Sequence, residues 1–321
     1  MQSLGEIKQD FINFIYNLLR FRCLLKEETV NKFFIENKES MQLLRQAFIH
    51  KSFDFVTNYE LLEFEGDVIV NAAVVEYIRN TYPNIVSVKW NTRLKHILVS
   101  GKILSRMAIR NGFENYLLVD EELKERFDTF EDKWDCEDYQ AAYEDTVEAL
   151  CGAIMRILNK HTVKGVGYVS CYNLISSFLQ EEKISLEYED VFDAKSRLKE
   201  LFDANQWNDV NGCRLNDCLF AMEKNEQAIN RYRKELRNSV DNDIINSTDR
   251  FIAFGYACVD GNTGSKKLLA VATANKKKNA EQKAADEVIK RLARLGISLH
   301  IPNAYEVVTK KPKKQRKGME L

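Results

Sequence analysis

The chain has 321 residues, of which 45% are apolar and 30% are charged, and this length suits two folded domains. No stretch approaches the roughly 18 consecutive apolar residues of a membrane span, and no signal peptide is indicated, so we expect a soluble, intracellular protein without membrane contact. Seven scattered cysteines without C-x-x-C spacing argue against a disulfide framework and against a zinc site.

Charge is divided unevenly between the two halves of the chain. Residues 1–190 hold 22 basic and 31 acidic side chains, whereas residues 191–321 hold 25 and 17, although the whole chain has a net charge of only −1. Such asymmetry indicates nucleic-acid contact by the basic half. The near-neutral average therefore does not exclude a nucleic-acid-binding protein.

The first informative segment is acidic. Residues 59–67 read Y-E-L-L-E-F-E-G-D, and on a helix Glu60, Glu63 and Asp67 share one face at i, i+3 and i+7. Gly66 costs about 1 kcal/mol relative to alanine inside a helix, so its presence indicates close packing against another backbone. This segment is predicted to be one half of a site.

The second half lies far downstream. Residues 145–150 read D-T-V-E-A-L, which places Asp145 and Glu148 on one helical face, and apolar neighbours of both segments would bring the two helices together. Carboxylates held close together repel one another unless a cation lies between them. Oxygen donors without nearby histidine or cysteine suit Mg²⁺, with Mn²⁺ as a substitute, and such a site supports phosphodiester hydrolysis. The alternative for either segment alone is a solvated charged face.

Both segments resemble motifs of the ribonuclease III family, E-x-L-E-F-L-G-D followed downstream by D-x-x-E-A-L. Residues 44–53 resemble the A-x-T-H-x-S-Y segment of this family, and residues 98–117 resemble its L-V-S…L-x-x-Y-L helix pair, so the resemblance covers about residues 40–180. It implies an all-α endonuclease domain, which we place at residues 1–188. The carboxylates that it implies as metal-binding and catalytic are Glu63, Asp67, Asp145 and Glu148, with Glu60 at an additional acidic position.

One position departs from this signature. Glu65 stands where the family usually has an apolar residue, in a stretch that lies at the family's homodimer interface. A buried unpaired carboxylate would cost several kcal/mol, so we expect Glu65 to be paired or to remain in water. The resemblance still implies a homodimer, whose two symmetric sites would cut both strands. His50, inside the upstream motif, is expected to be structural.

Residues 120–138 are strongly acidic and precede the second half-site. We expect a mobile, solvated loop or short helix there; the alternative is a segment that screens the cleavage channel until RNA displaces it.

The basic half begins a second pattern. Strands are predicted at residues 251–259 and 267–273, joined by a glycine-containing turn, and a helix is predicted from Lys277 to about Leu295, with Gly296 as its stop. Lys276, Lys277 and Lys278 cluster at the start of this helix, where the macrodipole favours anions. A bound phosphate would resolve that conflict; the alternative is a solvated face.

Residues 277–285 resemble the K-K-x-A-E-x-x-A-A end of a double-stranded RNA-binding domain, and residues 193–202 resemble its first helix. The resemblance implies an α-β-β-β-α domain at residues 189–300. The RNA contacts that it implies are Lys277, Lys278 and Lys283, with Glu200 as a candidate contact in the minor groove. The lysine cluster at the helix start adds Lys276 to the predicted RNA contacts. The family's G-P-x-H loop is missing, and residues 246–249 stand in its place. An insertion near residues 205–250 includes a predicted helix around residues 223–237, whose basic side chains either extend the RNA surface or are solvated.

These patterns predict an α+β chain, an all-α endonuclease domain followed by the smaller RNA-binding domain and a basic, disordered tail at residues 301–321. The predicted function is Mg²⁺-dependent hydrolysis of double-stranded RNA, leaving 5′-phosphate and 3′-hydroxyl ends with short 3′ overhangs. The alternative is a non-catalytic protein that sequesters or scaffolds duplex RNA. The length and charge of the chain suit a viral or eukaryotic relative, and the tail suits either RNA binding or nuclear import.

Overall fold

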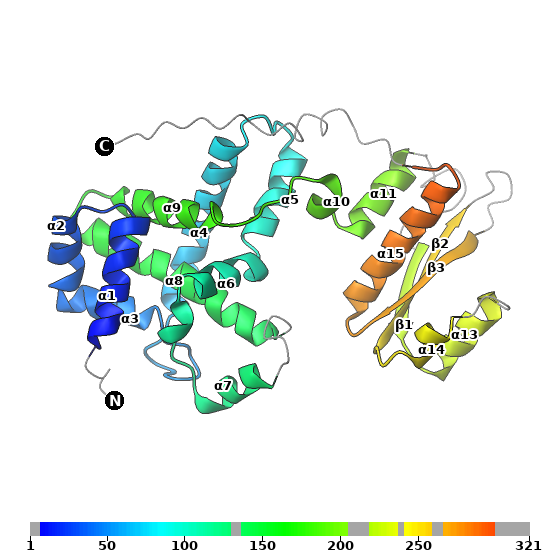
Figure 1. Cartoon of the computed structure of the whole chain (residues 1–321), viewed down its shortest axis with the longest axis horizontal. Coiled ribbons are helices and arrows are strands. Elements are labelled where there is room, and N and C mark those ends of the chain that lie inside the picture. Colours follow the sequence, from blue (N-terminus) through cyan, green and yellow to red (C-terminus); the bar gives the residue numbers. More distant parts are fainter. Residues whose placement is uncertain (1–6, 130–135, 205–217, 237–240, 259–265, 299–321) are drawn as a thin grey trace. The chain divides into compact units, whose positions relative to one another are not determined.

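The computed structural model describes residues 7–129, 136–204, 218–236, 241–258 and 266–298 (Figure 1). The chain divides into two compact units, with the boundary in the sequence between Ile184 and Ser185. Each unit has its own buried apolar residues. None of the helices in the described ranges is both long and apolar enough to cross a membrane.

Two long helices form the centre of the first unit, α4 (Glu60–Thr81) and α8 (Glu137–His161). They cross with their backbones in direct contact, because glycine stands on both sides of the crossing. A Cβ atom on Gly66 would lie 1.7 Å from the carbonyl oxygen of Glu148, and one on Gly152 would lie 2.2 Å from the carbonyl oxygen of Leu62. The close packing predicted from Gly66 is confirmed, and it aligns the two acidic segments.

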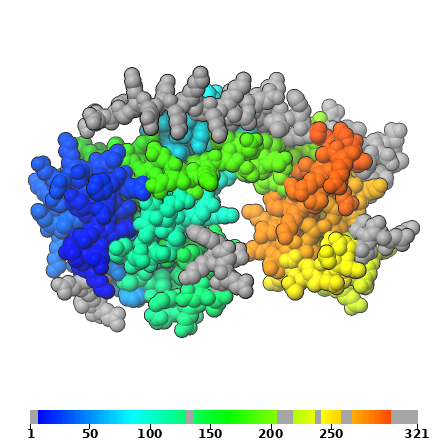
Figure 2. Space-filling view, in the orientation of Figure 1, coloured from blue at the N-terminus to red at the C-terminus, as the bar shows by residue number. Residues whose placement is uncertain are grey.

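Shorter helices surround this pair. α6 (Gly101–Arg110) packs on α8, and α9 (Val166–Leu179) packs on both α4 and α8. In the space-filling view, the N-terminal helices are drawn in blue and form one region of the surface (Figure 2). The remaining described helices of this unit are α1 (Gln9–Asn17), η1 (Leu18–Arg22), α2 (Glu27–Val30), η2 (Asn31–Ile35), α3 (Lys38–Gln46), α5 (Val88–Leu98), η3 (Phe113–Asn115) and α7 (Glu121–Asp128).

The acidic segment before α8 contains an ordered helix, α7. Its first turn is capped by the side chain of Asp120, which accepts a hydrogen bond of 2.9 Å from the amide of Leu123. Leu123 and Phe127 are buried, and the ring of Phe127 meets that of Tyr139 edge-on at 5.2 Å. The short-helix expectation is therefore confirmed for residues 121–128, whereas residues 130–135 lie outside the described ranges.

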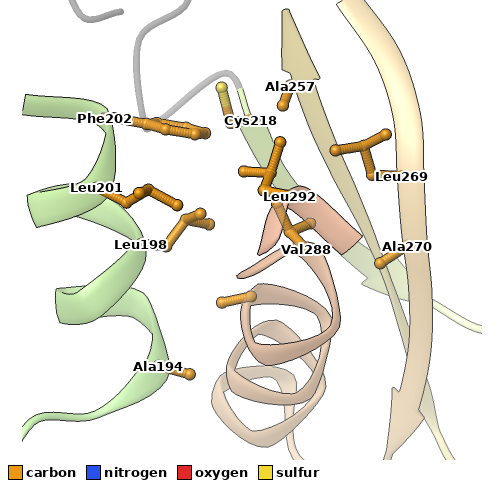
Figure 3. Close-up of a cluster of buried hydrophobic side chains, with 11 residues drawn as sticks. Ala194, Leu198, Leu201, Phe202, Cys218, Ala257, Leu269, Ala270, Val288 and Leu292 are labelled. Atoms are coloured by element: carbon orange, nitrogen blue, oxygen red, sulfur yellow. The ribbon is translucent and has the colours of Figure 1, made fainter. Parts of the chain in front are cut away.

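The second unit is built around an antiparallel sheet with the strand order β1-β2-β3. Its elements are α10 (Tyr188–Val191), α11 (Ala194–Ala204), β1 (Leu219–Glu223), α13 (Glu226–Leu236), α14 (Asn242–Asn246), β2 (Phe251–Cys258), β3 (Lys266–Ala274) and α15 (Lys277–Arg294). One face is covered by α15 with α11 beside it, through Leu198 and Phe202 of α11 and Val288 and Leu292 of α15 (Figure 3). The predicted strands and both flanking helices are confirmed.

The other face of the sheet is covered by the insertion. Ala228 and Tyr232 of α13 pack on Ile252 and Phe254 of β2. The helices α13 and α14 therefore lie between β1 and β2, where the expected α-β-β-β-α order has no helix. Their apolar side chains bury a face of the sheet that would otherwise be exposed.

Arg231 of α13 lies over the rings of Phe220 at 4.8 Å and Phe254 at 5.2 Å, and it donates a hydrogen bond of 2.9 Å to the hydroxyl of Tyr256. Arg231 therefore packs on the sheet, a role that the two sequence alternatives for the basic side chains of the insertion did not include.

Candidate active site

Three carboxylates from the two predicted half-sites meet in the first unit. One oxygen each from Glu63 on α4 and from Asp145 and Glu148 on α8 lies within 4.8 Å of the other two. Glu148 is 6% exposed, and the other two side chains are half-buried. Among the described residues this group contains only oxygen donors, which are the ligands of hard cations such as Mg²⁺ and Mn²⁺.

The other two predicted carboxylates lie at the edge of this group. Asp67 accepts a hydrogen bond of 2.6 Å from the side-chain amide of Asn71, and its charge acts on Glu148. Glu60 forms an ion pair of 3.0 Å with Lys51. The structure thus brings three of the five predicted side chains within ligand distance of each other, with Asp67 beside Glu148 and Glu60 turned toward Lys51.

Burial and mutual repulsion hold protons on this cluster. Burial first, and then the charge of Asp67, raise the pKa of Glu148 to about 9. Burial and the charge of Asp145 raise the pKa of Glu144, which the sequence reasoning did not single out, to about 7. Burial also raises the pKa of Glu63 and of Asp145. A cation that replaced these protons would remove the repulsion.

These pKa shifts predict that stability depends on pH. A carboxyl group whose pKa is higher in the folded chain binds its proton more tightly there, so metal-free stability should fall as the pH rises. For Glu148 this window extends from the ordinary value of 4.5 to about 9. In calorimetry of the metal-free protein, the unfolding temperature should be lower at about pH 8 than at about pH 6. Mn²⁺ should raise the unfolding temperature more at the higher pH, because metal binds the ionised carboxylates. Equal effects of Mn²⁺ at both pH values would contradict this.

Tyr59 is a site residue that the sequence analysis missed. Its hydroxyl donates a hydrogen bond of 2.9 Å to Oδ2 of Asp145, and its side chain is buried. Burial, followed by the charge of Asp145, raises the pKa of Tyr59, so the phenol keeps its proton and remains a donor. Its position directly before Glu60 could have identified it. It was missed because the sequence analysis considered only carboxylates that share a helical face.

A cleft of about 450 Å³ adjoins the carboxylates. It is lined by the turn at His50 and Lys51, by Glu63 and Asp145, and by Arg126 of α7. The acidic segment therefore forms a wall of the cleft beside the predicted site. His50 accepts a hydrogen bond of 3.0 Å at Nδ1 from the amide of Ser52, which agrees with its expected structural role.

Glu65 has a partner within the same chain. Both of its carboxylate oxygens accept hydrogen bonds of 2.5 Å from the guanidinium of Arg156 on α8. Both side chains remain about one-third exposed, at 38% and 34%. The expectation that Glu65 is paired or wet is confirmed, and this pairing removes the objection to an interface on this side of α4.

The predicted RNA contacts lie in the second unit. Lys276, Lys277 and Lys278 are exposed at the start of α15. Lys283 is also exposed, and its ammonium donates a hydrogen bond of 3.2 Å to the carbonyl oxygen of Thr273. Glu200 accepts a hydrogen bond from the hydroxyl of Tyr188. All five side chains remain predictions as RNA contacts.

The segment that stands in place of the G-P-x-H loop is anchored beside Lys283. Asp249 accepts hydrogen bonds of 2.6 Å from the hydroxyl of Thr273 and of 3.0 Å from that of Ser247. Thr273 also bonds Lys283 through its carbonyl oxygen. This segment and the basic start of α15 therefore lie at the same end of the sheet.

The carboxylate cluster lies in a part of the chain that matches a known domain model. Residues 60–156 match the model of the Ribonuclease III domain. The chain is 30% identical over 173 residues to "Putative ribonuclease 3" of Frog virus 3, an alignment that covers 51% of this chain and 43% of that protein. It is 24% identical over 308 residues to "Putative ribonuclease 3" of Invertebrate iridescent virus 6, with 90% of this chain and 89% of that protein covered.

Among solved structures, the nuclease domain of ribonuclease III from Campylobacter jejuni matches with 21% identity and a TM-score of 0.38, covering 53% of this chain and 97% of that one. The chain spans less than half of the frog virus protein and nearly nine-tenths of the invertebrate virus protein. The span that matches the domain model runs from Glu60 to Arg156 and contains every carboxylate of the cluster.

Proposed function

We propose that this chain is an endoribonuclease that hydrolyses double-stranded RNA with a bound divalent cation, and that this cation is Mg²⁺, with Mn²⁺ as a substitute. The observation that carries the proposal is the convergence of Glu63, Asp145 and Glu148 from two distant segments inside the span that matches the Ribonuclease III domain. Like charges gathered in a half-buried pocket repel one another, and a bound cation would stabilise this arrangement.

The donor set fits such a cation. Glu63, Asp145 and Glu148 would hold it, and Asp67 would add negative charge beside Glu148, directly or through water. When bound, the cation supplies charge neutralisation at the phosphate and activation of a water molecule. The neighbouring residues of the chain orient the carboxylates. Tyr59 holds Asp145, and Lys51 holds Glu60 at the rim of the cleft.

A cleavage assay tests this function. Labelled duplex RNA, single-stranded RNA and duplex DNA are incubated with the protein, with and without Mg²⁺, and the product ends are mapped. We expect cutting of duplex RNA alone, only with Mg²⁺, giving 5′-phosphate and 3′-hydroxyl ends with short 3′ overhangs. Retarded but uncut duplex RNA in the presence of Mg²⁺ would favour the non-catalytic alternative, and cutting of DNA would contradict the proposed substrate.

We further propose that the second unit binds the RNA duplex through the start of α15. The support is the exposed position of Lys276, Lys277 and Lys278 at a helix N-terminus, where phosphate binds favourably. The anchored segment at residues 247–249 lies at the same end of the sheet. Such contacts hold the phosphate backbone and carry no sequence preference.

Replacing Lys277 and Lys278 together by alanine should weaken duplex binding equally for different sequences. It should also flatten the dependence of log affinity on log salt by about 2, because two phosphate contacts are lost. Filter binding across a salt series measures the slope. Arg291 and Arg294, near the other end of α15, provide a control double substitution with the same change in charge. An unchanged slope in the lysine variant, or an equal change in the control, would reject phosphate contact at the helix start.

A homodimer through α4 is the proposed assembly. Leu61, Phe64, Val68 and Val75 form an exposed apolar stripe along this helix, and Phe64 is 72% exposed. Large exposed apolar patches mark interaction sites, and Glu65 beside the stripe is neutralised by Arg156. A second copy of the chain would cover the stripe and place two cleavage sites in one particle.

Replacing Phe64 by glutamate should convert the dimer to a monomer in analytical sedimentation at micromolar protein, because it places a charge in the centre of the apolar stripe. The same change at Val86, which is 81% exposed and lies outside α4, should leave the dimer intact. A wild-type protein that sediments as a monomer and only nicks duplex RNA would contradict the dimer.

A further inference from the structure

Tyr59 connects the two halves of the carboxylate cluster. Its hydroxyl donates a hydrogen bond of 2.9 Å to Oδ2 of Asp145 on α8. Its carbonyl oxygen accepts hydrogen bonds of 2.8 Å from the amide of Leu62 and of 2.9 Å from the amide of Glu63, which open α4. The same residue therefore fixes the side chain of one cluster carboxylate and the backbone of another.

The position of Tyr59 is itself held from behind. The amide of Tyr59 donates a hydrogen bond of 3.0 Å to the carbonyl oxygen of Ile49. His50, which follows Ile49 in the chain, donates its amide to the carbonyl oxygen of Leu118 at 2.9 Å. The imidazole of His50 meets the ring of Tyr59 edge-on at 5.6 Å. The ring is only 1% exposed. Backbone bonds on one side and ring packing on the other leave this phenol little freedom to turn away from Asp145.

A hydrogen bond to one oxygen of a carboxylate fixes how that group is rotated. For Asp145 this rotation determines whether an oxygen faces Glu63 and Glu148, which lie within 4.8 Å of it. Partners of this kind orient metal ligands, and their loss usually lowers metal affinity by about 10- to 100-fold. The turn at His50 has no chemical role in the proposed reaction. Its structural role is to hold Tyr59 in place.

We propose that Tyr59 is a positioning residue of the metal site, which orients Asp145 through its hydroxyl and sets the affinity for the divalent cation. This inference rests on the proposed metal-dependent function. Tyr59 touches neither substrate nor metal in this account and acts only through Asp145.

The test is Mn²⁺ titration calorimetry on the full chain without RNA, comparing the wild type with Tyr59→Phe. Phenylalanine keeps the ring and removes only the hydroxyl. We expect Mn²⁺ affinity to fall by about 10-fold or more, and the Mg²⁺ concentration for half-maximal cleavage to rise by a similar factor, with the rate recovering at high Mg²⁺. Tyr77→Phe removes a hydroxyl from a buried tyrosine in the second half of α4 and should leave both quantities unchanged.

A second pair of proteins separates positioning from general damage. In an Asp145→Ala background, Tyr59→Phe should cause no further loss of Mn²⁺ affinity, because the group through which it acts is absent. An equal further loss there, or wild-type Mn²⁺ and Mg²⁺ dependence in Tyr59→Phe alone, would overturn the proposal while leaving the proposed function intact. A wild type that neither binds Mn²⁺ nor cuts RNA would instead refute the function itself.

If Tyr59→Phe does not fold, as judged by circular dichroism, the Mn²⁺-loaded crystal structure of the wild type still decides the question. The proposal requires the hydroxyl of Tyr59 to stay within hydrogen-bond distance of Asp145 while the other carboxylate oxygen faces the ion. A carboxylate rotated off the phenol to reach the ion would overturn it.

Discussion

Replacing Glu148 by glutamine is expected to abolish cleavage of duplex RNA and to leave duplex binding nearly unchanged. Glu148 is the most buried member of the cluster at 6% exposure, and it lies within 4.8 Å of both other ligand candidates. Glutamine keeps the shape of the side chain but removes the negative charge that the cation needs. The loss of several kcal/mol of transition-state stabilisation corresponds to a rate reduction on the order of 10³-fold or more.

Single-turnover cleavage with Mg²⁺ measures the rate, and gel retardation with Ca²⁺ in place of Mg²⁺ measures binding separately. A matched control is Glu39→Gln, because Glu39 is 78% exposed and forms a surface ion pair with Lys160. The control should cut at the wild-type rate. Cutting by Glu148→Gln within a few-fold of that rate would remove Glu148 from the site.

Replacing Gly66 by alanine should cost both stability and activity. The added methyl carbon would lie 1.7 Å from the carbonyl oxygen of Glu148, so α4 and α8 must move apart. Overpacking of this kind costs about 1–3 kcal/mol, against a gain of about 1 kcal/mol from the better helix propensity of alanine. Because backbone atoms collide, we expect the overpacking cost at the upper end of that range and a net loss of about 2 kcal/mol.

The activity should fall further than the stability loss alone explains. A displacement of about 1 Å between reacting groups can reduce a rate by about 10²-fold, and separation of the helices moves Glu63 away from Glu148. Urea denaturation and cleavage under conditions where the variant is fully folded distinguish the two effects. Arg79→Ala, at a 74% exposed position on the same helix, should change stability by less than about 0.5 kcal/mol. A Gly66→Ala protein with wild-type stability and rate would contradict the helix crossing.

The carboxylate cluster was largely predictable because helical spacing is a local property. Glu63, Asp145 and Glu148 were identified from i, i+3 spacing, and Gly66 signalled the close crossing that brings them together. Spacing could not show that Glu60 turns to Lys51, because that ion pair joins α4 to a turn outside the helix. Tyr59 was missed for the same reason, since it precedes the first turn of α4 and bonds across the fold to α8.

The insertion shows the same limit in the second unit. Its main helix was predicted from periodicity, and α13 is close to the expected span. Its role could be seen only with the sheet in place, because Arg231 and Tyr232 pack on residues of β2 that lie at least 20 positions downstream. The sequence alone could not show what Arg231 does, because it does not reveal that aromatic rings of the sheet lie under its guanidinium group.

The most direct test of the metal site is anomalous diffraction from crystals of the wild-type protein grown with Mn²⁺. We expect an anomalous peak bounded by the carboxylates of Glu63, Asp145 and Glu148, and its loss in crystals of Glu148→Gln. A Mn²⁺ ion bound elsewhere, with these three carboxylates free of metal, would contradict the account.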